Sequence, residues 1–169
     1  SLKIFVPTLA CWVGYDLDGR ADIHWSQSLT FRLTEKAVQL GRYAQQLESI
    51  SGSQKIGPLA KLTQRLKTAS DDTARHAALF AADLTDPNNL VPAANALTEH
   101  TTRTVLDASE IIDVLDGVIP TAEDSLAAEL MAIRAQVEAL QLGTAHIHLR
   151  VNAAQVRTVI NRDLGLQTE

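Results

Sequence analysis

The stretch that decides the fold class is SQSLTFRLTEKAVQLGRYAQQLESI, residues 26–50, because its apolar side chains recur every three or four positions. The repeating residues are Leu29, Leu33, Ala37, Leu40, Ala44 and Leu47. This spacing places the apolar side chains on one face of an α-helix. We therefore predict a long amphipathic helix that begins near residue 26 and ends at the SGS sequence of residues 51–53.

Three further stretches show the same spacing, over residues 59–80, 90–115 and 126–140. The stretch of residues 90–115 is the most regular, with Leu90, Ala94, Leu97, Thr101, Thr104, Ala108, Ile111 and Leu115. Four such stripes with short connections are typical of antiparallel neighbours. The sequence therefore predicts a mainly α fold, with long antiparallel helices in an up-down-up-down four-helix bundle.

The two ends of the chain show different patterns. Residues 144–152 alternate strictly between apolar and polar, which predicts a β-strand, and residues 153–163 predict a short helix. A lone strand needs a partner, so this one must pair with the N-terminal segment, with another copy, or with chain beyond this sequence. We expect one domain made of a strand and loop segment (1–25), a helical bundle (26–142) and a strand plus short helix (143–169).

Composition excludes several classes of protein. The 169 residues are 46% hydrophobic and carry a net charge of −5, which argues against a nucleic-acid-binding protein. The single cysteine, Cys11, rules out an internal disulfide. No apolar run approaches the roughly 20 residues that a membrane-spanning helix needs. A cytoplasmic protein that makes no membrane contact is the expectation.

The polar face of the predicted strand carries the most chemistry, with His146, His148, Arg150 and Asn152 on one side. An arginine beside two imidazoles can bind a carboxylate or phosphate, and two histidines two positions apart can bind a metal. A strand whose polar side simply faces water is the third interpretation.

The loop of residues 14–22, GYDLDGRAD, holds three carboxylates, from Asp16, Asp18 and Asp22. It is not a calcium-binding EF-hand loop, because the sixth position is Ala21 and the twelfth is Gln27, where that motif needs glycine and glutamate. The aspartates either cap backbone N–H groups of a turn or pair with an arginine elsewhere in the protein.

Other polar residues are expected to be structural. Thr73 and His76 fall on an apolar stripe, so we expect both to be polar groups of the core whose hydrogen bonds are satisfied. His24 precedes the first helix and is expected to cap it or to pack beside Trp25. Cys11 lies in an apolar run and predicts an inert buried thiol.

Residues 11–20, CWVGYDLDGR, resemble a signature of the phosphoenolpyruvate carboxylase family, Ser-Trp-(Ile/Met)-Gly-Gly-Asp-Arg-Asp-Gly-Asn. Five positions match, namely Trp12, Gly14, Asp16, Asp18 and Gly19, whereas Tyr15, Leu17 and Arg20 depart from the pattern. A second, weaker likeness lies in residues 142–153, LGTAHIHLRVNA, which resemble the family strand Phe-Gly-x-x-Leu-x-(Arg/Ser)-x-Asp-x-Arg-Gln. Both segments occur in the family's order, with helices between them.

The resemblance implies an internal, divergent slice of a larger α/β-barrel enzyme. The parent would join bicarbonate to phosphoenolpyruvate with Mg²⁺ or Mn²⁺, giving oxaloacetate and phosphate. Where the family strand ends in a substrate-binding arginine, this chain has Asn152, and Arg150 two residues earlier lies on the same face.

We expect Arg150, His148 and Asn152, with Asp16, Asp18 and Arg20, to form one wall of the substrate site. The slice lacks the family's histidine, metal-binding and glycine-rich segments, so it is not catalytic alone, and no metal ligand is assigned within it. Apolar surface that meets the missing parts predicts self-association. The alternative is an interaction or regulatory module from a relative that has lost its catalytic activity.

Overall fold

The computed structural model describes residues 10–11, 24–50, 52–98, 104–144, 146–147 and 152–163, and it confirms a mainly helical protein. Short 3-10 turns at Ser53–Lys55 and Ile119–Thr121 join neighbouring helices. The other elements, in order, are β1 (Ala10–Cys11), α1 (Trp25–Ser49), α2 (Gly57–Phe80), α3 (Pro87–Thr98), α4 (Ser109–Val118), α5 (Asp124–Leu140), β2 (His146–Ile147) and α6 (Ala153–Asp163).

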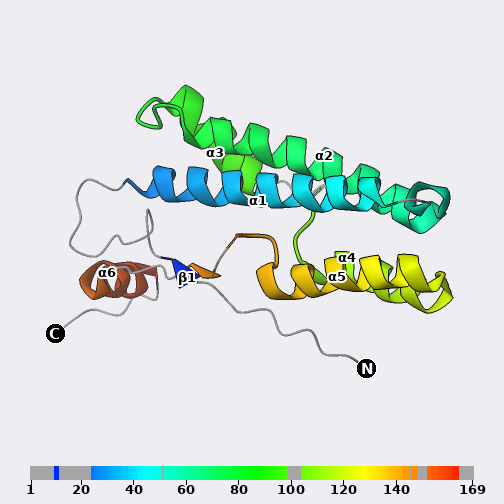
Figure 1. Cartoon of the computed structure of the whole chain (residues 1–169). Helices are drawn as coiled ribbons and strands as arrows, with labels where there is room; N and C mark the ends of the chain where they lie inside the picture. Colours follow the sequence, from blue (N-terminus) through cyan, green and yellow to red (C-terminus); the bar gives the residue numbers. More distant parts are fainter. Residues whose placement is uncertain are drawn as a thin grey trace.

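Helices α1 and α2 form a long antiparallel hairpin (Figure 1). His24 caps α1, as predicted, because its Nδ1 accepts the backbone N–H of Ser26 and the Gln27 side chain accepts the N–H of His24. The connection turns at Gly52, which has a φ of 83°. Glycine adopts this left-handed conformation at little cost because it has no β-carbon. Pro58 lies in the first turn of α2, where its missing N–H leaves no helical hydrogen bond unmade.

The predicted apolar stripes of α1 and α2 are buried against each other and against the rest of the core. Leu40, Leu47, Leu59 and Leu66 have no exposed surface. Farther along the hairpin, Ser70 donates a 2.8 Å hydrogen bond across to the carbonyl oxygen of Ala37. Thr73 is buried and bonds the carbonyl of Ala69, which confirms it as a satisfied polar group of the core.

The prediction of one long third helix over residues 90–115 is wrong. The chain forms two shorter helices, α3 and α4, and residues 104–107 between them are not helical. Leu90 and Leu97 were expected to be buried but are 40% and 45% exposed, whereas Ile111 and Leu115 are fully buried. The stripe therefore joined two helices that pack against different parts of the protein.

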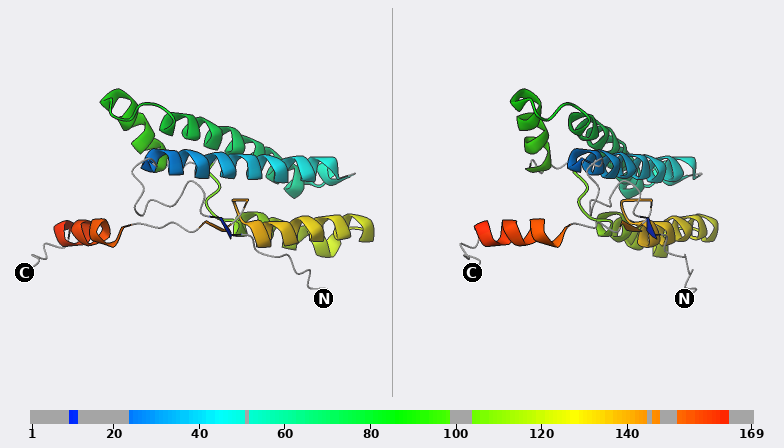
Figure 2. Two further views of the ribbon diagram at one scale, coloured as in Figure 1. Left: turned by 60° about the vertical axis from the view of Figure 1, so that its left-hand side comes forward. Right: turned by 90° about the vertical axis from the view of Figure 1, so that its left-hand side faces the viewer.

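Helix α3 belongs to a small separate cluster in which Ala93 packs with Phe80 and Leu84. Helices α4 and α5 form a second, shorter hairpin, which lies beneath the C-terminal half of α1 (Figures 1 and 2). The main core joins the two hairpins, and α4 and α5 contribute Ile111, Leu115, Val118, Leu130, Ile133 and Val137 to it.

Strand β2 pairs in parallel with β1, with Ala10 opposite His146 and Cys11 opposite Ile147. The expectation that the strand would need a partner is met by the N-terminal segment. The predicted boundaries of residues 144–152 are too wide, because Thr144 lies in a bend and Asn152 is not in a strand but directly precedes α6. The predicted short helix over residues 153–163 is confirmed as α6.

Candidate functional site

Each strand of the β1–β2 pair is followed in the sequence by one of the predicted site segments, but most residues of these segments lie outside the described residues. Residues 12–23 follow β1 in the sequence, and residues 148–151 follow β2. The predicted site and motif residues Trp12, Gly14, Asp16, Asp18, Gly19, Arg20, His148 and Arg150 lie outside the described residues, as does Asp22.

Asn152 is the one predicted substrate-binding residue that the structure describes. It is exposed, and its Oδ1 accepts the backbone N–H of Ala154 at 2.8 Å. This bond satisfies one of the free donors at the start of α6, so the residue acts as a helix cap. Its acceptor oxygen is therefore engaged within the chain.

A second polar arrangement lies on α1 and is not among the site residues that the sequence predicts. We call it the polar seam, and it consists of Arg32, Lys36, Gln39, Tyr43 and Gln46. The alternating spacings of four and three residues place these side chains on one helical face. Gln39 is 1% exposed and Tyr43 is fully buried, so the middle of the seam is interior.

The lower half of the seam binds α5 and the turn that follows it. The Tyr43 hydroxyl donates to the carbonyl oxygen of Gln141 at 2.9 Å, and the Gln46 amide donates to Oε1 of Gln136 at 2.8 Å. Burial raises the pKa of the Tyr43 phenol, against a smaller lowering by the Gln39 amide. The seam therefore fixes how the two hairpins meet.

We expect Tyr43→Phe to destabilise the protein by about 1 kcal/mol, because the Gln141 carbonyl loses its donor while the ring still fills the core. Urea unfolding followed by circular dichroism measures this change. Gln45→Ala is the control, since Gln45 is exposed on the same helix. Equal effects of the two substitutions would contradict a stabilising role for the Tyr43 hydroxyl.

The upper half of the seam meets the segment that leads into β2. Glu35, beside the seam, accepts a hydrogen bond from the Thr144 hydroxyl at 3.2 Å and pairs with Arg32 at 3.5 Å. Gly143 lies so close to the Arg32 guanidinium that a β-carbon at this position would overlap it. These contacts attach the start of β2 to α1.

Glu110, which attracts the charge of Lys36, also joins two helices through an ion pair. Arg65 of α2 forms an ion pair with Glu110 of α4 and donates to the carbonyl oxygen of Thr104 at 3.4 Å. The other oxygen of Glu110 accepts the backbone N–H groups of Leu106 and Asp107 at 2.9 and 3.3 Å. Glu110 therefore connects the start of α4 to α2.

The pKa values of Glu110 and Lys36 are both lowered, but for different reasons. Partial burial, the largest influence, raises the pKa of Glu110, but the two backbone N–H groups and Arg65 together bring it below its ordinary value. Burial and the repulsion of Arg32 lower the pKa of Lys36, while attraction to Glu110 opposes them. Among the described residues no carboxylate comes within ion-pair distance of the Lys36 ammonium.

Three buried polar atoms of the described residues have no hydrogen-bond partner, and two of them belong to residues of the seam. They are Oε1 of Gln39, Oε1 of Gln46 and Nε of Arg65. Buried groups of this kind are normally satisfied by protein, water or a ligand. The sequence carried one signal for them, the heptad-like spacing of polar residues on α1, but their neighbours depend on how the hairpins pack.

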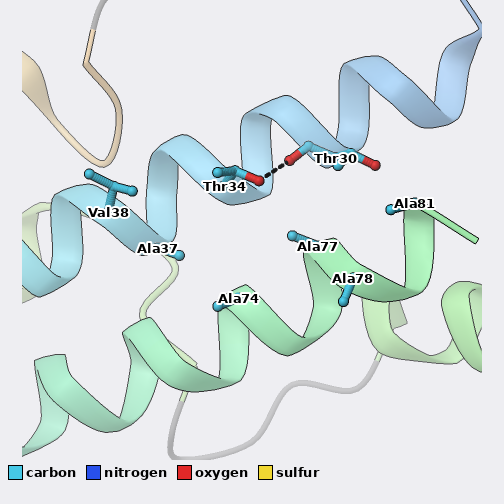
Figure 3. A pocket seen from close by; sticks show the side chains of 8 residues that line it. All are labelled: Thr30, Thr34, Ala37, Val38, Ala74, Ala77, Ala78 and Ala81. Carbon is cyan, nitrogen blue, oxygen red and sulfur yellow. Dashed lines mark hydrogen bonds between the residues drawn. The ribbon is translucent and has the colours of Figure 1, made fainter.

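A shallow surface groove offers less chemistry than the seam. A shallow groove between α1 and α2 is lined by methyl groups and threonines, and the Thr34 hydroxyl there donates to the backbone of Thr30 (Figure 3). Within the described ranges, no group of three or more histidine, cysteine or acidic side chains is arranged to hold a metal ion. In that same part of the chain, no helix is both long and apolar enough to cross a membrane.

Comparison with known proteins finds no matching family model, no matching curated protein and no matching solved structure.

Proposed function

We propose that this chain is an internal portion of a phosphoenolpyruvate carboxylase-like protein, a slice of a larger α/β-barrel enzyme. In this proposal α1, α2, α4 and α5 form a four-helix-bundle-like scaffold. The parent joins bicarbonate to phosphoenolpyruvate and releases oxaloacetate and phosphate, a carbon-fixing reaction that replenishes the tricarboxylic acid cycle. The observation that supports the proposal best is the parallel pairing of β1 with β2.

The pairing matters because each strand leads directly into one of the two family-like segments. Residues 12–20 follow β1, and residues 148–152 follow β2. Parallel strands need a long crossover between them, and the helices of residues 24–140 supply it. In barrel enzymes the substrate-binding residues stand at the carboxyl ends of such strands. Two family-like segments in these positions favour a shared wall of one site.

Within this wall we assign Arg150 as the cation that holds the substrate anion. Asn152 is a weaker candidate, because its acceptor oxygen caps α6. His148 and Arg20 would add hydrogen-bond donors, and Asp16 and Asp18 would order the loop. The resemblance implies Mg²⁺ or Mn²⁺ for the parent, and among the described residues no group of side chains is arranged to hold either ion.

The test of the proposal is bicarbonate-dependent oxaloacetate formation by the intact parent protein, read out through malate dehydrogenase. Phosphoenolpyruvate is supplied with Mg²⁺ and then with Mn²⁺. We expect activity with at least one of these ions. A well-folded parent that forms no oxaloacetate with either ion would contradict the proposal.

The same assay tests the role of Arg150. We expect Arg150→Ala to raise the KM for phosphoenolpyruvate about tenfold or more, because a charge-assisted hydrogen bond to the substrate is lost. Arg157→Ala is the matched control, since Arg157 is exposed on the neighbouring helix α6. An unchanged KM in Arg150→Ala, with the protein still folded, would exclude Arg150 as the substrate-facing cation.

The alternative candidate is a helical interaction module from a relative without catalysis. Exposed apolar side chains on two helices favour it, namely Leu90, Val91 and Leu97 on α3 and Val156, Val159 and Ile160 on α6. Surfaces of this kind commonly meet a partner or a second copy. A parent sequence without the family's histidine, metal-binding and glycine-rich segments would favour this module over the enzyme.

A further inference from the structure

The turn between α5 and β2 contains a strained residue. Gln141, directly after α5, has a φ of 55° and a ψ of −134°, and it is the one non-glycine residue with a positive φ in the part of the chain that the structure describes. These angles are typical of the first central residue of a type II′ β-turn, which closes here because the N–H of Gly143 donates to the carbonyl oxygen of Leu140 at 3.1 Å. Glycine is normal at that position, because a β-carbon makes a positive φ costly.

The surroundings of Gln141 hold it in this conformation. The hydroxyl of the fully buried Tyr43 donates to its carbonyl oxygen at 2.9 Å, and the next residue, Leu142, belongs to the main core. A strained backbone conformation persists only where its neighbours fix it. Relaxation of Gln141 to a negative φ would turn its carbonyl away from Tyr43 and would redirect the chain that follows. The strain and the hydrogen bond therefore oppose each other.

The chain that follows the turn is β2. Within the described structure β1 and β2 pair with each other, and neither packs extensively on a helix. Directly after the turn, Gly143 lies against the Arg32 guanidinium, and the Thr144 hydroxyl donates to Glu35. The direction in which the chain leaves Gln141 therefore sets where the strand pair lies relative to the helices.

We propose that the turn at residues 140–143 is a conformational switch with two states. In the first state, the Tyr43 hydrogen bond keeps the turn strained and the strand pair in place. In the second state this bond is broken, Gln141 has a negative φ, and the strand pair leaves the helices while the helices stay folded. The proposal does not depend on the proposed function.

Two observations make the second state accessible. One hydrogen bond contributes about as much free energy as one strained residue costs, so the two opposing contributions nearly cancel. The carbonyl oxygen of Gln136 lies 3.5 Å from the Tyr43 hydroxyl, so the hydroxyl keeps an acceptor within reach when the bond to Gln141 breaks.

Glycine substitution tests the strain at Gln141. We expect Gln141→Gly to raise the Tm of the full 169-residue chain by roughly 2–4 °C, because glycine adopts the positive φ at little cost. Gln45→Gly, at an exposed helical position of α1, should lower the Tm instead. Gln141→Ala removes the same side-chain hydrogen bond to the Glu138 carbonyl but keeps the β-carbon, so it should give no rise. A Tm of Gln141→Gly that is unchanged or lower would overturn the proposal.

Hydrogen exchange tests the control by Tyr43. We expect Tyr43→Phe to speed the exchange of backbone amides in peptides that contain Gly143 and β2 about fivefold, because one hydrogen bond that favours the first state is lost. Adding Gln141→Gly to Tyr43→Phe should slow this exchange again, since glycine keeps the turn without help from Tyr43. Exchange that stays as fast in the double variant as in Tyr43→Phe would overturn the proposal.

The urea dependence of the same exchange shows whether the strand pair opens separately from the helices. An opening that leaves the helices folded exposes little surface, so exchange in the β2 peptides should depend only weakly on low concentrations of urea. Core amides of α2, around Leu66, exchange through unfolding of the whole protein and should depend on urea strongly. Equal urea dependence of the two regions would mean that the second state does not exist, and the proposal would be wrong.

Discussion

Replacing Leu115 with alanine is expected to lower the free energy of unfolding by about 3 kcal/mol. Leu115 is fully buried in the main core, on helix α4, which contacts both α2 and α5. Removing most of its side chain loses the transfer free energy of the buried methyl groups and leaves a cavity that the neighbours fill only in part. Urea unfolding, followed by circular dichroism, measures the change.

Leu97→Ala is the matched control, because the sequence places both leucines on one apolar stripe. Leu97 is 45% exposed on α3, so we expect its replacement to cost less than about 0.5 kcal/mol. The comparison tests the break between α3 and α4 directly. Similar losses of stability for the two variants would contradict the break and favour the original prediction of one continuous helix over residues 90–115.

That break could have been found from the sequence. Residues 107–110, DASE, have the sequence pattern of a capping box, which is typical of the start of a helix. The structure shows the expected bonds, because the Asp107 side chain accepts the N–H of Ser109 and the Glu110 side chain accepts the N–H of Asp107. Apolar spacing alone hid this signal, because residues on two different helices happened to continue one period. The apolar stripes of α1, α2 and α5 each predicted a single helix correctly, because each helix is bounded by a clear turn or cap.

Some features of the candidate site can also be predicted from local sequence, whereas others depend on contacts between distant residues. The need of the C-terminal strand for a partner follows from the pattern of residues 144–152, and β1 supplies that partner. The polar seam has a visible period on α1, but nothing local tells that Tyr43 meets Gln141 or that Glu110 meets Arg65. Those partners lie 98 and 45 residues apart and depend on how the hairpins pack.

Replacing Glu110 with alanine is expected to cost about 2 kcal/mol, the largest effect of any exposed or half-exposed side chain discussed above. One oxygen caps two backbone N–H groups before α4, and the other neutralises Arg65. Without Glu110, Arg65 loses the carboxylate of its ion pair, and the attraction between Glu110 and Lys36 is also lost. Glu123→Ala is the control, because Glu123 precedes α5 in a similar place but makes no capping bond with its side chain.

The stability that Glu110 supplies also depends on pH, and the sign follows from the direction of its pKa. The folded pKa lies below the ordinary value of 4.5, so the unfolded state takes up a proton first as the pH falls. The advantage of the unaltered chain over Glu110→Gln is therefore complete at neutral pH and is lost as the pH falls below 4.5 through the folded pKa. Urea midpoints of both proteins between pH 7 and pH 3 measure this difference. A gap that stays constant over that range would mean that the charge of Glu110 contributes nothing and that its backbone caps alone hold the start of α4.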